Sequence, residues 1–147
     1  MEKYMEEALI RKYFSADAYV QLSGIEITEI TPKSVVVSAE IGPQHLNANG
    51  FVQGGMLYTM ADFAFAVHAN YLHPATVTQC GHINYIRPAK TKRLKASAKE
   101  ILRSGHNTLS EVTIFDENDQ VVCVCNFNGF VKDVDKETWE QMIKKEE

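Results

Sequence analysis

Residues 54–71 read GGMLYTMADFAFAVHANY, and they constrain the fold more than any other part of the chain. In a helix running from about Gly54 to about Tyr71, apolar side chains occupy nearly every face. Such a helix has no polar side to turn toward water and must be covered by other elements. Its single carboxylate, Asp62, is costly to bury unless it is hydrogen-bonded, neutralised or open to a ligand cavity.

Strand-like segments on both sides of this helix supply a cover for it. Period-two patterns, β-branched residues and turn signals predict six strands. They run roughly over Ile25–Ile30, Ser34–Ile41, Ala75–Arg87, Arg93–Ser104, Asn107–Asp116 and Val121–Val131. Short turns between consecutive strands imply an antiparallel sheet. We expect an α+β fold in which one curved antiparallel sheet wraps around the long central helix.

Both ends of the chain are predicted to be helical. Met1–Phe14 forms the first helix, and a short C-terminal helix carries Trp139, Met142 and Ile143 on one face. No internal repeat or linker interrupts the 147 residues, which are enough for one domain, 1–147, with a real core.

Composition and charge exclude several classes of protein. Hydrophobic residues make up 45% and charged residues 23%, as in an ordinary globular protein. The net charge of −4 argues against a nucleic-acid partner. No apolar run is long enough to span a membrane, and the N-terminus lacks a secretory signal, so we expect a cytoplasmic protein without a membrane partner.

The cysteines and histidines predict neither a metal site nor a cofactor. The three cysteines, Cys80, Cys123 and Cys125, are too few for a disulfide framework and suit a reducing compartment. A zinc site would need four ligands, so buried structural thiols are expected instead. His68 lies six residues beyond Asp62, on nearly the opposite side of the helix, and is expected to be structural.

The loop before the long helix is rich in asparagine and glycine. Gly54 and Gly55 open the helix, where backbone N–H groups are unpaired and the positive end of the helix dipole points. Donors of this kind can hold a developing oxyanion. An ordinary glycine-rich turn is the alternative, just as Asp62 could have a partner in the core or lie on a wet helix face.

These residues together resemble the signature of the hotdog-fold acyl-CoA thioesterases, in the PaaI-like branch. The resemblance rests on Asn47, Gly50, Gln53, Gly54, Gly55 and Asp62. The family signature has Asn, Gly and His-Gly-Gly, then an acidic residue eight positions after the first Gly of the pair. The stretch INYIRPAK, residues 83–90, is similar to the family's strand ending in an aromatic residue and a Pro-Ala pair. The resemblance covers residues 13–132 and implies a hotdog fold.

The resemblance also implies hydrolysis of acyl-CoA and a role for each site residue. It assigns the Gly54 N–H to the oxyanion, and Asn47 to the carbonyl or the loop architecture. It makes Asp62 the general base that positions water, or the nucleophile that forms an anhydride. Thr78 would help to place the water, or is a plain strand residue. Gln53 replaces the family's histidine, which excludes an imidazolium there but leaves a role in orienting the thioester or the loop.

A dense run of basic residues, 87–95, begins at the end of the predicted strand Ala75–Arg87. This run could bind the phosphates of coenzyme A, or it could be a solvated connection between two strands. The expected substrate-binding residues are Gly55, Arg87, Lys90, Lys92 and Arg93.

The spacing of Gly54 and Asp62 predicts more than one subunit. Eight residues of helix separate them by about 12 Å, so one copy cannot place both beside one carbonyl carbon. A homodimer with two shared sites, or a dimer of dimers, is expected, and the family's dimer implies the same.

Two alternatives stay open: a non-catalytic acyl-CoA sensor, and a hydratase or dehydratase, for which no histidine sits at the matching site. The acyl group is not predicted, and Phe51, Phe63 and Phe65 line its tunnel or belong to the core.

Overall fold

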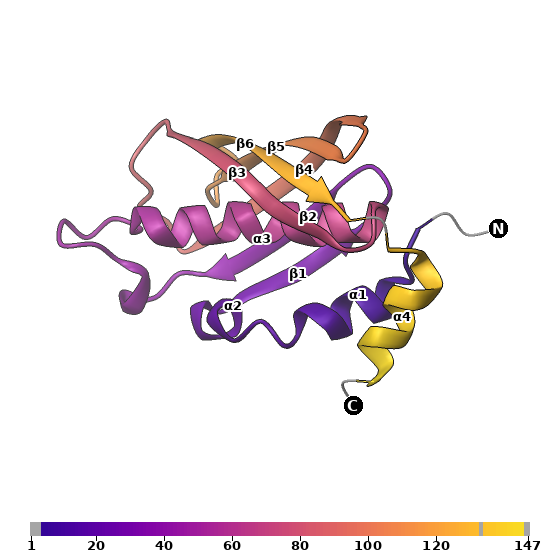
Figure 1. Ribbon diagram of the computed structural model, residues 1–147. Helices are drawn as coiled ribbons and strands as arrows, with labels where there is room; N and C mark the ends of the chain where they lie inside the picture. The colour runs from indigo at the N-terminus through magenta and orange to yellow at the C-terminus, as the bar shows by residue number, and fades with distance from the viewer. Residues whose placement is uncertain (1–3, 133, 146–147) are drawn as a thin grey trace.

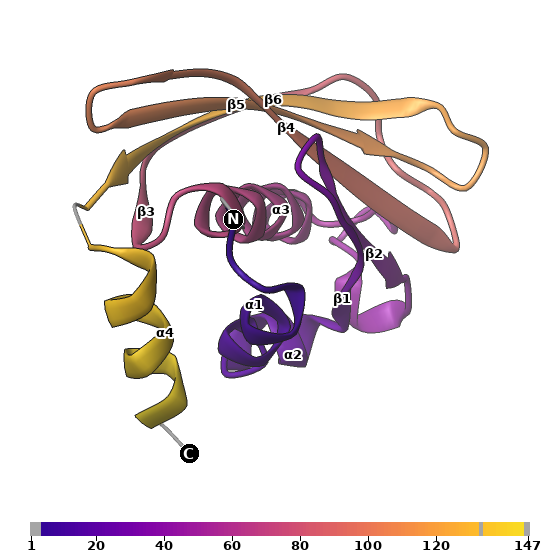
Figure 2. The ribbon, with the colours of Figure 1, turned by 90° about the vertical axis from the view of Figure 1, so that its right-hand side faces the viewer.

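One antiparallel sheet of six strands curves over a long helix (Figures 1 and 2). The computed structural model describes residues 4–132 and 134–145. The strands are β1 (Ile25–Ile30), β2 (Val35–Glu40), β3 (Thr76–Tyr85), β4 (Arg93–Ser104), β5 (Asn107–Phe115) and β6 (Val121–Val131). They lie in the order β1-β2-β4-β5-β6-β3, and every neighbouring pair is antiparallel.

The helices lie on one side of this sheet. They are α1 (Glu7–Phe14), α2 (Ala18–Ser23), α3 (Gly54–Leu72) and α4 (Lys136–Lys145), with a short 3₁₀ turn at Pro43–His45. Figure 2 shows α3 directly beneath the sheet and α1 and α2 below α3. Trp139 of α4 packs on Tyr13 of α1 with the ring centroids 5.0 Å apart. The predicted architecture, a sheet around a central helix, is confirmed.

The terminal and short elements differ from the sequence prediction. Within the described residues the first helix begins only at Glu7, and residues 1–3 lie outside them. Helix α2 was not predicted, because six residues are too few to show a helical period. It is held by its caps: Asp17 accepts the Val20 N–H at 3.1 Å, and Gly24 ends the helix at φ 73°. Met142 is 56% exposed, so it does not share the buried face of α4.

Helix α3 is covered on most sides but not on all. Its residues Met60, Ala61, Ala64, Phe65 and Val67 are fully buried. A stripe at spacing four is only partly buried, and it consists of Tyr58, Asp62 and Ala66. The stripe faces β3, the edge strand, whose residues are mostly exposed. The sheet therefore ends before it closes over this side of the helix.

The sheet supplies the core with an aromatic and thiol layer. Phe127 of β6 stacks on Phe65 of α3 with centroids 5.5 Å apart. Cys123 and Cys125 are fully buried beside it, and burial raises their thiol pKa values to about 11 and about 12. The expectation of buried thiols is confirmed for this pair, whereas Cys80 is exposed on β3.

His68 has the structural position expected for it. Its side chain is 1% exposed, and its Nε2 lies 3.3 Å from the Pro32 carbonyl oxygen. Among the described residues its Nδ1 has no hydrogen-bond partner. Because burial disfavours the charged ring, the pKa of His68 is lowered from 6.5.

We predict that His68 makes the protein less stable as the pH falls below 6.5. Its lowered folded pKa means that the unfolded state binds the proton more readily, so this stability is complete above 6.5 and is lost toward the folded pKa. Urea unfolding across this range measures it, and His68→Gln should flatten the dependence. The exposed His82→Gln serves as the control, and equal slopes for wild type and His68→Gln would contradict the prediction.

Candidate active site

The first turn of α3 leaves one glycine N–H open. Gln53 is the N-cap, and its side-chain Oε1 accepts the N–H of Gly55. Its backbone carbonyl accepts the N–H groups of Met56 and Leu57. Among the described residues the Gly54 N–H donates to nothing, as expected for one of the first N–H groups of a helix. Gly54, and not Gly55, therefore has the N–H group that is available to a ligand.

The loop before α3 is shaped by Asn47. Its Oδ1 accepts the N–H groups of Asn49 at 2.9 Å and Phe51 at 3.1 Å, which folds the chain over Gly50 at φ 82°. The loop is tied back where the Val52 N–H donates to the Ala89 carbonyl at 2.9 Å. Of the two roles considered for Asn47, this geometry is that of loop architecture.

A pocket of about 570 Å³ opens beside this loop and the helix start. Tyr85 lines it, and the Tyr85 hydroxyl donates to the Gly54 carbonyl at 3.1 Å. Phe51 lines the pocket, whereas Phe63 and Phe65 belong to the core. The lining residues are Asn47, Asn49, Phe51, Val52, Gly54, Gly55, Leu57, Tyr85, Ile86, Arg87, Pro88 and Ala89.

Asp62 lies two turns further along α3, on the stripe that faces β3. The Thr78 hydroxyl donates to its Oδ1 at 2.8 Å. Burial raises the pKa of Asp62, the hydrogen bond from Thr78 opposes that rise, and the nearby carboxylate of Asp17 adds to it. The carboxyl group is thus hydrogen-bonded on one oxygen and poised to accept a proton more readily than an ordinary aspartate.

The predicted site residues fall into two groups in one copy of the chain. Gly54 and Asn47 lie at the helix start with Gln53 and Gly55, while Asp62 and Thr78 lie about 12 Å along the axis from them. One copy brings Asp62 and Thr78 into hydrogen-bond contact, and it places Gly54 on the wall of the pocket. It does not bring the two groups to one point.

Within the basic run, the arginine side chains have partners in the protein and two of the lysine side chains are exposed. Arg87 lines the pocket while its Nε and Nη1 donate to the Val121 carbonyl and Gln120 Oε1, both at 2.9 Å. Arg93 forms an ion pair with Glu40. Lys90 and Lys92 are exposed, and no ion pair of their ammonium groups occurs within the described part of the chain.

Three side chains that lie close to the predicted site residues, Tyr58, Tyr85 and Asp17, were not identified from the sequence. Tyr58 stands one turn before Asp62 on the same face of α3, and this spacing could have identified it. Burial is the main cause that raises the pKa of Tyr58, and the nearby charge of Asp62 raises it further. Tyr85 was part of the family stretch but had no contact assigned. Asp17 comes close to Asp62 only through the fold of the α1–α2 corner.

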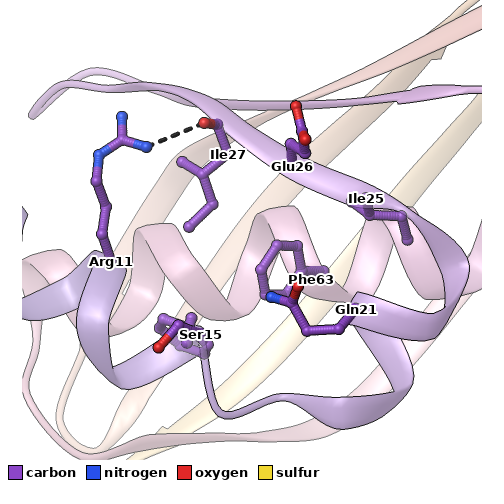
Figure 3. Close-up of a pocket in the computed structure, with 8 residues that line it drawn as sticks. Arg11, Ser15, Gln21, Ile25, Glu26, Ile27 and Phe63 are labelled. Carbon is purple, nitrogen blue, oxygen red and sulfur yellow. Dashed lines mark hydrogen bonds between the residues drawn. The ribbon is translucent and has the colours of Figure 1, made fainter.

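A smaller pocket of about 190 Å³ between α1, α2 and β1 is separate from the site (Figure 3). Arg11 at its rim is engaged, since Nη1 donates to the Ile27 carbonyl at 3.0 Å and Nε to Glu7 Oε1 at 3.1 Å. None of the predicted catalytic residues lines it.

Within residues 4–132 and 134–145, no three His, Cys, Asp or Glu side chains gather in a group that could hold a metal ion. None of the helices in these ranges combines the length and hydropathy needed to cross a membrane.

A model of the thioesterase superfamily matches residues 49–123, which is about half of the chain. The chain belongs to the thioesterase superfamily. The match includes the glycine pair, Asp62 and Thr78. The predicted enzyme class, a thioester hydrolase, is confirmed at the level of the family.

Relatives of known sequence and structure place the chain more narrowly. It is 25% identical to the acyl-coenzyme A thioesterase PaaI of Escherichia coli K12, over 76% of this chain and 80% of that one. The TT0310 protein of Thermus thermophilus is 29% identical, with a TM-score of 0.73 over 78% of this chain and 97% of that one. A hypothetical thioesterase of Streptococcus pneumoniae TIGR4, crystallised with coenzyme A, is 26% identical, with a TM-score of 0.76 and coverage of 82% and 95%. The predicted hotdog fold and PaaI-like resemblance are confirmed.

We predict that Thr78→Val raises the pKa of Asp62 further. The hydroxyl stabilises the ionised carboxylate, so its loss favours the protonated form, whereas Thr78→Ser should leave the pKa nearly unchanged. Titration of the Asp62 carboxyl carbon by NMR measures the effect without any substrate. An unchanged or lower pKa in Thr78→Val would show that the two side chains do not interact in solution.

Proposed function

We propose that this chain hydrolyses acyl-CoA thioesters to a free acid and coenzyme A, at two sites shared by the subunits of a homodimer. The observation that carries the proposal is the placement of Asp62 with Thr78 on an uncovered stripe of α3, two turns from the open Gly54 N–H. The coenzyme A in the pneumococcal thioesterase and the activity of the E. coli PaaI relative support the substrate class.

The dimer follows from the unclosed side of the subunit. The edge strand β3 has a free edge beside the uncovered stripe of α3, and Val77, Tyr85 and Ile86 there are about half exposed. A second copy related by a two-fold axis would cover both features. Antiparallel α3 helices would then place Asp62 of the partner subunit beside Gly54, and each site would receive one group from each chain.

The chemistry needs only groups at this junction. The thioester carbonyl oxygen accepts the Gly54 N–H, while Asp62 and Thr78 of the other chain hold a water against the carbonyl carbon. Asp62 takes a proton as the water oxygen adds, and the oxyanion forms at Gly54. Collapse breaks the C–S bond, and the proton passes from Asp62 to the departing thiolate. The raised pKa of Asp62 suits a base near neutral pH.

Direct attack by Asp62 is the alternative within the same site. Its carboxylate would form an anhydride and expel the thiolate, and water would then hydrolyse the anhydride. Neither route uses an imidazolium, so Gln53 is compatible with both. Its side chain holds the N–H of Gly55 and so fixes the helix start at which Gly54 stands.

A non-catalytic acyl-CoA sensor is the second candidate, and Gln53 in place of the family's histidine is the feature that favours it. Release of free thiol from a panel of short, long and aryl acyl-CoAs separates the two functions. Binding of acyl-CoA without release from any member of the panel would establish the sensor and exclude the hydrolase.

The basic run is proposed to bind the nucleotide phosphates, through Lys90 and Lys92 and the pocket residue Arg87. Arg93 is already paired with Glu40, so we expect it to bind phosphate less well than the other members of this set.

We predict that salt raises KM more for acyl-CoA than for acyl-pantetheine, which lacks those phosphates. The double variant Lys90→Gln/Lys92→Gln should remove the difference and Lys33→Gln should not. Equal salt sensitivity of the two substrates in wild type would exclude phosphate binding here.

Two single variants test the shared site. We predict that Asp62→Asn lowers kcat by about a hundredfold to ten-thousandfold, because an amide can act neither as base nor as nucleophile. Gly54→Pro should lower it by about a hundredfold to a thousandfold, because proline deletes the one N–H. Proline suits the first helical position, and Gln53 at φ −67° and ψ 138° is compatible with a following proline. Gly54→Ala retains the N–H and is the control.

Mixed dimers of these two variants then place the groups on different chains. Random pairing after equal co-refolding makes about half of the dimers mixed, and each has one intact and one doubly damaged site. About a quarter of wild-type activity should return, measured as thiol release. Verified mixed dimers that remain as inactive as either parent would refute the shared site.

A further inference from the structure

Tyr58 fills the space between α3 and β3 one turn before Asp62. Its ring lies 5.5 Å from that of Phe127, edge to face. A Cβ atom built on Gly81 of β3 would lie 2.3 Å from the Tyr58 hydroxyl oxygen. The edge strand thus has glycine opposite Tyr58 because the phenol occupies the place of a side chain.

The proposed dimer fixes where Tyr58 stands relative to the two sites. If Gly54 is level with Asp62 of the partner subunit, the two-fold axis passes between the two α3 helices at the level midway between these positions, which is that of residue 58. The two thioester carbonyls are then about 12 Å apart along the helices, and each lies about 6 Å from the axis. Tyr58, which is partly buried on the stripe, then stands beside the axis between the two carbonyls, opposite Tyr58 of the partner subunit.

We propose that the paired Tyr58 side chains form the inner wall of both acyl pockets and restrict the enzyme to short acyl groups. This inference rests on the proposed function and extends it to the acyl group. An acyl chain that leaves the carbonyl along the helix seam meets the phenol within about 6 Å. The phenol packs on the ring of Phe127, and Phe65 stacks on the same ring from α3. Removing the phenol therefore opens an apolar extension of the pocket.

The first arm of the test measures chain-length preference. In Tyr58→Ala, the ratio of kcat/KM for dodecanoyl-CoA to that for butanoyl-CoA should rise at least about tenfold, since each additional buried CH₂ favours the longer chain. Tyr58→Leu keeps an apolar contact with Phe127 and should give a smaller rise, which provides a second variant if Tyr58→Ala does not fold. Tyr58→Phe keeps the ring and should leave the ratio unchanged, as should Tyr19→Ala, at an exposed aromatic residue of α2.

The second arm measures position without any substrate. In a Cys80→Ser background, Tyr58→Cys should be joined to its symmetry mate by a short bis-maleimide and run as a dimer on a denaturing gel. The remaining thiols, Cys123 and Cys125, are buried with pKa values of about 11 and about 12, so they should not react. Lys33→Cys, in the β1–β2 turn, is exposed and should label without forming the cross-linked dimer.

The outcomes separate this inference from the proposed function. Thiol release by wild type with an unchanged length ratio in both Tyr58→Ala and Tyr58→Leu would overturn the wall and leave the hydrolase standing. Absence of cross-linking in Tyr58→Cys would overturn the two-fold placement. If wild type binds non-hydrolysable acyl-CoA thioethers without turning over thioesters, the ratio of Kd for the butanoyl thioether to Kd for the dodecanoyl thioether should rise at least about tenfold in Tyr58→Ala, and an unchanged ratio would overturn the wall. Binding of none of them would overturn the proposed function and the wall with it.

Discussion

The burial of α3 is the constraint on which the rest of the structure depends. An almost wholly apolar helix of 19 residues must be surrounded, and the sheet on one side with α1 and α2 on the other cover it, while the Tyr58–Asp62–Ala66 stripe is only partly buried. The strand beside that stripe, β3, has a neighbour on one side only. Incomplete cover of the helix and an unpaired sheet edge thus coincide on one side of the subunit. This coincidence, more than any single residue, favours a second copy of the chain as the missing cover.

The start of the same helix combines stability with chemistry. Gln53 caps the helix through Gly55, and Asn47 folds the preceding loop through two N–H groups. These contacts satisfy the neighbouring donors and leave the Gly54 N–H exposed to the pocket. An open N–H with rigid surroundings is the arrangement that stabilises an oxyanion at little reorganisation cost. The substitution of the family's histidine by glutamine is accommodated because the capping oxygen needs no charge.

The sequence could predict what depends on local pattern. The apolar run gave α3, and the period-two segments gave all six strands to within a few residues. The order of the strands depends on non-local pairing and could not be obtained this way. Register was equally inaccessible at β3, where a shift between Thr78 and Cys80 interrupts the alternation. Strict alternation would turn Cys80 toward α3 together with Thr78. The shift leaves Cys80 exposed and sets Gly81 against Tyr58, so the contact opposite the stripe depends on an irregularity without a sequence signature.

The electrostatics of Asp62 give the proposed dimer a further physical consequence. In one subunit, burial already raises the pKa of Asp62, and a covering partner removes more water from the carboxylate. The same partner would bring the N-terminus of its own α3, whose dipole and open Gly54 N–H favour negative charge. In the proposed dimer, the contact that desolvates Asp62 would thus also supply the field that keeps its carboxylate ionised. During the reaction that field serves the oxyanion, as Asp62 accepts the proton and loses its charge. In the proposed dimer, one helix end would then stabilise the negative charge first on the base and afterwards on the substrate.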